Sequence, residues 1–223
     1  METKRAPAGP IDLADRVKWT EVFGREAPLE VEIGSGMGGF ALGQAAAHPE
    51  INLVAIEVRQ KLAQQTAEKA QRRGLDNLLV LNADAKVILP RMFAPASIDV
   101  VHIQFPDPWW KARHHDRRLV EDRFSILLYN LLRLDGLLEV RTDVEARGVE
   151  MAMALEGIGF VNRFGPGALA PYDPAEVPSS RERGYLASGQ PVYRYKFSRS
   201  EAPPRHLLEP LPPSTVGPEQ RRR

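Results

Sequence analysis

The hydrophobic and polar positions along the chain predict strands that alternate with helices. Residues 29–34 alternate apolar and acidic side chains, which indicates a strand with one buried face. Further apolar runs predict strands at 52–58, 77–84, 98–105 and 136–143. Helical patterns are found at 41–47, 59–73, 118–133 and 144–156. This alternation predicts an α/β fold, with a mostly parallel sheet and helices on both of its faces.

The remaining segments predict how the domain is bounded. Short apolar pieces near 159–164 and 192–197 are expected to pair as antiparallel strands at the edge of the sheet. Residues 166–184, which are rich in Pro, Ser and charge, predict a long surface loop. We expect an N-terminal extension over 1–28, one α/β domain over 29–200 and a Pro-rich tail over 201–223. The tail has no amphipathic period, so we expect it to be disordered and its final arginines to be solvated.

Composition excludes several classes of protein. The 223 residues are 43% hydrophobic and include no cysteine, which excludes disulfide scaffolds, thiolate metal sites and cysteine nucleophiles. No apolar run is long enough to span a membrane, and the first ten residues, METKRAPAGP, lack the apolar core of a secretion signal. No spacing typical of a metal site is visible. We therefore expect a cytoplasmic protein that binds neither a membrane nor a metal.

Charge is balanced over the whole chain but not locally. The formal net charge is +1, so global charge does not indicate a nucleic-acid partner. Between Trp109 and Arg118, however, four Lys and Arg residues stand against the single acid Asp116. Such a basic segment attracts a polyanion while the rest of the surface stays neutral.

A glycine-rich turn, GSGMGG, follows the first predicted strand. In a parallel sheet this is where ligands bind, beyond the carboxyl ends of the strands. Gly34, Gly36 and Gly39 match the dinucleotide fingerprint GxGxxG. Gly34, Gly36 and Gly38, with Glu32 before them, match instead the acid-x-Gly-x-Gly-x-Gly loop of methyltransferases that use S-adenosylmethionine.

The acidic residues favour the second interpretation. Glu32 would repel the diphosphate of a dinucleotide but attract the ammonium and sulfonium of S-adenosylmethionine. Glu57, Asp84 and Asp107 follow at the ends of the next strands, where Glu57 suits ribose hydroxyls and Asp84 the exocyclic amine of adenine. We expect Glu30, in contrast, to be a solvent-exposed residue of its strand. His102 is expected to be a hydrogen-bonded core residue.

A second motif lies after the fourth predicted strand. The string FPDPWWKARHHDRR (105–118) presents Asp107 between two prolines, followed by aromatic residues and a basic run. It resembles the FPDPW-x-K-x-RH-x-x-RR signature of the bacterial tRNA (guanine-N7-)-methyltransferases, which modify guanine 46. The resemblance extends from residue 29 to 198 through EIGSGMGGF, NADA, RTD and SSRERGYLASGQPVYRYKF. It implies a Rossmann-like class I methyltransferase domain with a mostly parallel seven-stranded sheet.

The resemblance also implies roles for individual residues. Asp107 is the implied catalytic residue. The implied cofactor-binding residues, toward S-adenosyl-L-methionine, are Glu32, Gly34, Gly36, Gly38, Glu57, Asp84 and Asp107. The implied substrate-binding residues are Lys111, Asp143, Ser179, Ser180, Arg181 and Glu182. The implied RNA-contacting residues are Arg113, His114, His115, Asp116, Arg117 and Arg118. Asp116, Ser179 and Arg181 depart from the family pattern, where a basic residue, a threonine and an aromatic residue are common.

The implied partner is tRNA, and the protein is expected to be a monomer or a homodimer. Guanine N7 has a lone pair and no proton, so its methylation requires alignment and charge stabilisation rather than a general base. Asp107 would stabilise the developing charge, and Asp143 would orient the guanine. Glu182 would either accept a hydrogen bond from the base edge or lock the loop that closes over it.

Three alternatives remain open at this point. DPWW is loosely similar to the (D/N)PP(Y/F/W) loop of adenine N6-methyltransferases. The GxGxxG match would also suit a dinucleotide-dependent oxidoreductase. A non-catalytic RNA-binding module could keep the same fold. Glu32 argues against the second alternative, and the full set of acids argues against the third.

Overall fold

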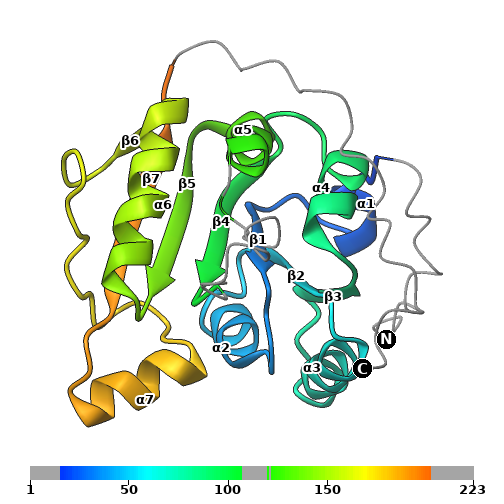
Figure 1. Ribbon diagram of the computed structural model, residues 1–223. Helices are drawn as coiled ribbons and strands as arrows, with labels where there is room; N and C mark the ends of the chain where they lie inside the picture. Colours follow the sequence, from blue (N-terminus) through cyan, green and yellow to red (C-terminus); the bar gives the residue numbers. More distant parts are fainter. Residues whose placement is uncertain (1–15, 107–119, 121, 202–223) are drawn as a thin grey trace, which may run out of the picture.

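The computed structural model describes residues 16–106, 120 and 122–201. Within these residues seven strands form one sheet in the order β3-β2-β1-β4-β5-β7-β6, so the predicted α/β architecture is confirmed (Figure 1). The strands are β1 (Leu29–Ile33), β2 (Asn52–Glu57), β3 (Leu78–Asn82), β4 (Ile98–Gln104), β5 (Leu132–Thr142), β6 (Phe160–Asn162) and β7 (Tyr193–Arg199). The helices are α1 (Trp19–Phe23), α2 (Gly39–Ala47), α3 (Gln60–Arg72), α4 (Ala85–Met92), α5 (Asp122–Leu131), α6 (Glu145–Ile158) and α7 (Ser180–Ser188).

The first five strands are parallel, and the last two are not. β1 pairs with β2 and β4, while β3 and β5 extend the parallel sheet on its two sides. β7 is antiparallel to both β5 and β6, which confirms the predicted antiparallel pair. β6 forms the edge of the sheet, whereas β7 lies between β5 and β6.

Alternation along the strands separates two apolar clusters on opposite faces of the sheet. One cluster contains Val54 and Ile56 of β2 and packs against α1, α4, α5 and α6. The other contains Leu53 and Ala55 of the same strand and packs against α2 and α3. Since successive side chains of a strand point to opposite faces, this division confirms the expectation of helices on both faces.

Three helices, α1, α4 and α7, were not predicted from the sequence. Helix α4 includes Pro90 and is only eight residues long, and Asp84 caps it by accepting a hydrogen bond from the backbone N–H of Lys86. Helix α1 spans five residues, and its buried Trp19 stacks on Phe93 with ring centroids 4.7 Å apart. The part of the N-terminal extension that the structure describes therefore packs on the core of the domain.

The segment from 166 to 184 was expected to be a loop throughout, and this prediction is wrong for its last part. Helix α7 begins at Ser180, and the hydroxyl of Ser179 caps it by accepting a hydrogen bond from the backbone N–H of Glu182. The sequence signal was present, because Ser followed three residues later by Glu is a helix-start pattern. Figure 1 shows α7 below the sheet, at the end where α2 begins.

Candidate functional site

The glycine turn connects β1 to α2 and lies beyond the carboxyl end of β1. Gly36 adopts a left-handed backbone with φ of 54°, and its N–H donates to the carboxylate of Glu57 over 2.7 Å. Gly38 has φ of 75°, and a Cβ atom there would lie 2.3 Å from the side chain of Thr66. Both the left-handed backbone and the close approach of α3 therefore require glycine in this turn.

A cavity of about 340 Å³ opens beside this turn. The end of β1, the glycine turn, α2, the end of β4 and the start of α7 all contribute to its lining. Of the residues singled out in the sequence, the lining includes Glu32, Gly34, Gly36, Ser179, Ser180 and Arg181. It also includes Phe105, the first residue of the second motif, and Ser35, Arg59 and Gln104, to which the sequence analysis gave no role.

Glu32 is the carboxylate among the lining residues of the cavity, and it is only 2% exposed. Burial raises the pKa of Glu32 to about 7, although the charge of His102 and the backbone N–H of Ala41 act in the opposite direction. Its Oε2 atom has no hydrogen-bond partner among the described residues. Burying a carboxylate oxygen without a hydrogen-bond partner costs free energy. Such an unpaired oxygen is expected in a site that binds a cationic ligand, because the ligand supplies the missing partner.

Glu57 and Asp84 lie at the ends of β2 and β3, as predicted. Glu57 is buried and accepts hydrogen bonds from the backbone N–H groups of Gly36 and Arg59 and from the Arg59 guanidinium. It thereby fixes the glycine turn against β2. Asp84 caps α4. Neither acid is part of the cavity lining, but Glu57 is connected to the site through Gly36 and Arg59, which both line the cavity.

Helix α7 forms one wall of the cavity and approaches the glycine turn closely. A Cβ atom on Gly39 would lie 2.0 Å from the Oγ atom of Ser180. The guanidinium of Arg181 lies 5.7 Å from the ring centroid of Phe105, within the range of a cation–π contact. Phe105 itself has a left-handed backbone, with φ of 51°, at the end of β4. Such strain in a residue without a glycine's freedom is typical of functional sites.

Asp143 and Glu182 are both held by protein partners. Tyr185 of α7 donates a hydrogen bond to Asp143 over 2.6 Å. Glu182 is 1% exposed and binds Arg141 at 2.5 Å and Arg194 at 2.7 Å. Both carboxylate oxygens of Glu182 are therefore bound by arginines, which holds the start of α7 against β5 and β7.

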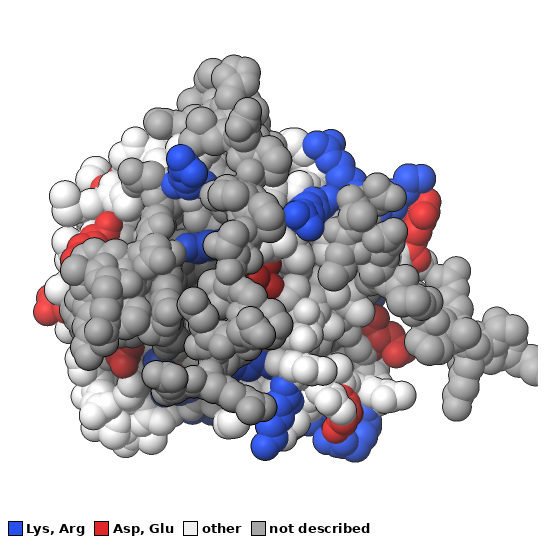
Figure 2. All heavy atoms as spheres, turned by 45° about the vertical axis from the view of Figure 1, so that its right-hand side comes forward, with Lys and Arg blue, Asp and Glu red and all other residues white. Residues whose placement is uncertain are grey.

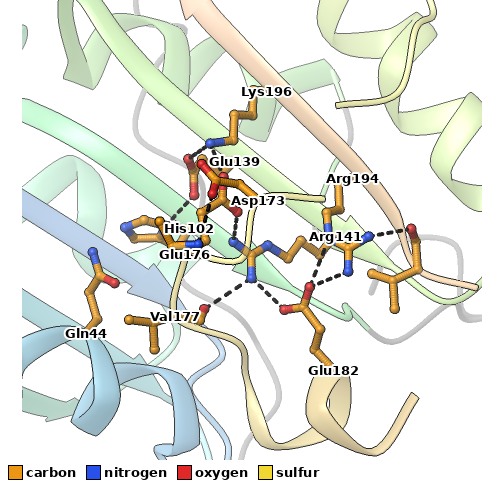
Figure 3. A network of polar contacts seen from close by, with 12 residues as sticks. Gln44, His102, Glu139, Arg141, Asp173, Glu176, Val177, Glu182, Arg194 and Lys196 are labelled. Carbon is orange, nitrogen blue, oxygen red and sulfur yellow. Dashed lines mark hydrogen bonds and ion pairs between the residues drawn. The ribbon is translucent and has the colours of Figure 1, made fainter. Parts of the chain in front are cut away.

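These arginines belong to a buried ionic cluster that continues across the sheet (Figure 3). The cluster consists of Glu30, His102, Glu139, Arg141, Glu176, Glu182, Arg194 and Lys196. His102 lies between Glu30 at 2.9 Å and Glu139 at 3.2 Å. Burial by itself would lower the pKa of His102, but these two carboxylates raise it to about 9. His102 is thus a hydrogen-bonded core residue, as predicted.

The expectation that Glu30 is solvent-exposed is wrong. Glu30 is 8% exposed and binds both His102 and Gln44 of α2. The physical reason is that β4 presents a basic residue to β1 on the face that an isolated strand pattern assigns to solvent. The sequence does contain a signal, namely the acids Glu30 and Glu139 on the strands that flank His102. This signal can be recognised only when the order β1-β4-β5 is known.

Several predicted residues lie outside the part of the chain that the structure describes. They are Asp107, Lys111, Arg113, His114, His115, Asp116, Arg117 and Arg118.

On the face shown in Figure 2, the described Lys and Arg side chains lie among acidic side chains rather than forming a continuous basic surface. No helix among the described residues is long and apolar enough to cross a membrane. Within the same residues, no three His, Asp or Glu side chains are grouped as they would be around a metal ion.

Comparison with known proteins gives a consistent result. A family model with the description "Putative methyltransferase" matches residues 26–195. The tRNA (guanine-N(7)-)-methyltransferase of Myxococcus xanthus is 53% identical over 80% of this chain and 87% of its own. The enzyme of the same name from Anaeromyxobacter dehalogenans is 54% identical over 83% of this chain and 90% of its own.

Solved structures share the fold at low sequence identity. The 16S rRNA (adenine(1408)-N(1))-methyltransferase from Catenulisporales acidiphilia, solved as a point mutant with cosubstrate SAM, matches with a TM-score of 0.59 at 20% identity, covering 90% of this chain and 96% of that one. The 16S rRNA methyltransferase KamB matches with a TM-score of 0.59 at 17% identity, covering 82% and 93%. The likeness confirms a class I methyltransferase fold.

Proposed function

Since the chain belongs to the tRNA (guanine-N(7)-)-methyltransferase family, we propose that it transfers a methyl group from S-adenosyl-L-methionine to N7 of guanine 46 in tRNA, forming 7-methylguanosine. The observation that most directly supports this proposal is the unpaired carboxylate oxygen of Glu32, buried in the cavity beside the glycine turn. An anionic group at this place attracts a cationic cofactor and repels the diphosphate of a dinucleotide.

The residues present fit S-adenosylmethionine. Glu32 would bind its ammonium, and the cavity beside Gly34 and Gly36 would receive its amino-acid end. Glu57, which fixes the glycine turn, would accept from the ribose hydroxyls, and Asp84 from the adenine amine. When bound, S-adenosylmethionine supplies an electrophilic methyl group on a sulfonium.

The protein's own part in the reaction is to align the base and to balance charge. N7 of guanine has a free lone pair, so no residue has to remove a proton. Asp143, held by Tyr185, would accept from the N1–H and the exocyclic amine of guanine. Arg181, with Phe105 behind it, would offer a flat guanidinium beside the cavity on which a purine can stack.

The roles of the residues outside the described part rest on the resemblance. Asp107 would stabilise the charge that develops on the purine, which is an electrostatic role. Lys111 and the run Arg113, His114, His115, Asp116, Arg117 and Arg118 would contact the RNA, mostly through phosphates.

The test is methyl transfer from labelled S-adenosylmethionine to unmodified tRNA, followed by nucleoside analysis. We expect labelled 7-methylguanosine with the natural tRNA and none with a transcript in which guanine 46 is replaced by adenine. Another methylated nucleoside would overturn the target atom, and transfer to the adenine-46 transcript would overturn the position.

A further inference from the structure

Three side chains that line the cavity have polar atoms without a hydrogen-bond partner among the described residues. They are Glu32 through Oε2, Ser35 through Oγ, and Gln104 through both Nε2 and Oε1. Their exposed fractions are 2%, 6% and 9%. Buried polar groups in proteins are nearly always paired, so three exceptions that meet at one cavity call for a common explanation.

Gln104 is the most informative of the three, because no contact within the described part of the chain explains it. It is the last residue of β4 and shares a face of the sheet with His102, two positions earlier. Its neighbours on that face have other partners: His102 binds Glu30 and Glu139, and Arg141 binds Glu176 and Glu182. An apolar side chain at 104 would avoid the cost of a buried unpaired amide.

The three groups together have a specific chemistry. Glu32 contributes a negatively charged hydrogen-bond acceptor, and Ser35 contributes a hydroxyl that can donate or accept. Gln104 contributes an amide with two N–H donors and one carbonyl acceptor. A ligand that satisfies all of them needs a cationic donor next to an anionic acceptor. The zwitterionic end of an amino acid, with its α-ammonium and α-carboxylate, has both.

We propose that Gln104 and Ser35 bind the amino-acid end of S-adenosylmethionine and so select a cofactor that has this end. The Gln104 amide N–H and the Ser35 hydroxyl donate to the α-carboxylate, while the Gln104 carbonyl joins Glu32 in accepting from the α-ammonium. This inference rests on the proposed function and goes beyond it by assigning two residues to cofactor selection.

The test is calorimetric titration of the purified protein, without tRNA, with three ligands. S-adenosylmethionine and S-adenosylhomocysteine both have the amino-acid end, whereas 5′-methylthioadenosine lacks it. In Gln104→Leu we expect the affinity for the first two ligands to fall about tenfold or more, because hydrogen bonds to charged groups are lost. The affinity for 5′-methylthioadenosine should stay unchanged. Ser35→Ala should show the same selectivity with a smaller loss.

Two controls keep the result interpretable. Gln64→Leu makes the same chemical change on the exposed side of α3 and should leave all three affinities unchanged. Because the Gln104 amide has no partner among the described residues, Gln104→Leu should unfold at a temperature no lower than that of the unmodified protein. Melting at a lower temperature would contradict the inference, because it would mean that the amide has a structural partner.

The other outcomes distinguish this inference from the proposed function. An equal loss for all three ligands would overturn the inference, since the amide would then affect the nucleoside site. Unchanged affinities for the three ligands, together with a raised KM for tRNA, would also overturn the inference. The Gln104 amide would then contact the guanine base of the tRNA. Failure of the unmodified protein to bind S-adenosylmethionine would overturn the proposed function itself.

Discussion

The guanidinium of Arg141 lies 2.5 Å from the carboxylate of Glu182, and both side chains are almost completely buried. Two residues further along the chain from Arg141, Asp143 accepts a hydrogen bond from Tyr185, which is three residues beyond Glu182. Arg141 and Asp143, two positions apart at the end of β5, therefore contact one side of α7. Their partners there, Glu182 and Tyr185, are three positions apart. This pairing fixes both the position and the rotation of α7, whose first residues line the cavity.

Replacing Glu182 by Gln should destabilise the protein strongly, because the buried Arg194 would lose its carboxylate partner and the buried Arg141 would keep only Glu176. Breaking a buried ion pair on one side typically costs about 3–5 kcal/mol. Urea unfolding measures the loss, and hydrogen exchange of α7 should show that this helix opens first.

Glu21→Gln is the matched control for this variant. Glu21 pairs with Lys18 on the surface, with 71% of its side chain exposed, so its loss should cost less than about 1 kcal/mol. Equal effects of the two variants would contradict the locking role of Glu182.

The sheet and its order of strands and helices could be predicted because each element has its own periodicity. Apolar residues at 52–58 and 98–105 alternate with helical patterns, and this suffices to predict parallel pairing. Glu32 could be singled out as well, since an acid just before a glycine turn has few structural uses. Local patterns therefore predicted the architecture and the acid that lines the cavity.

The polar face of the sheet could not be predicted, because it depends on which strands are neighbours. Glu139 and Lys196 are Cα partners in the register of β5 and β7, although 57 residues separate them along the chain. Gln104 was missed for a different reason: a glutamine at the end of a strand attracts no notice until its unpaired amide is seen inside a cavity.

Gly39→Ala should disturb the wall of the cavity. The added Cβ would lie 2.0 Å from the Oγ atom of Ser180, and inserting a methyl group into a packed contact typically costs about 1–3 kcal/mol. We expect a lower free energy of unfolding and weaker binding of S-adenosylmethionine, measured by urea unfolding and calorimetry.

Two further variants test this explanation. Ser180→Ala removes the clashing oxygen and should restore part of the loss in the double variant. Gly184→Ala, also on α7 but with nothing within 4 Å of its added Cβ, should stabilise the helix by about 0.5–1 kcal/mol. A Gly39→Ala protein that is as stable as Gly184→Ala would disprove the close contact.

His102 should make the protein less stable as the solution becomes alkaline. Its pKa rises from the ordinary 6.5 to about 9 in the folded state, so the folded state favours the protonated ring. The resulting stabilisation is complete below pH 6.5 and is lost as the pH rises through 9; it is on the order of 3 kcal/mol. Unfolding at several pH values should show this decline, and His102→Gln should flatten it while lowering stability at about pH 6.

Glu32 should make cofactor binding depend on pH in a lower range. The pKa of Glu32 is raised from 4.5 to about 7, so the folded protein without ligand retains its proton more tightly than the unfolded chain. Its contribution to stability is therefore full below pH 4.5 and declines as the pH rises through 7, and Glu32→Gln should abolish this decline.

The ammonium group of the cofactor favours the ionised form of the Glu32 carboxylate. Binding of S-adenosylmethionine below about pH 7 should consequently release a proton, and its affinity should increase between about pH 5.5 and 7.5.

Calorimetry in buffers of different ionisation enthalpy measures this released proton directly. His102 does not obscure the result, because its pKa of about 9 keeps it charged over the whole range. Glu32→Gln should bind the cofactor more weakly, with an affinity that no longer changes with pH and without proton release. If Glu32→Gln instead kept the pH dependence of the unmodified protein, another group would be titrating, and the assignment of Glu32 to the cofactor's ammonium would fail.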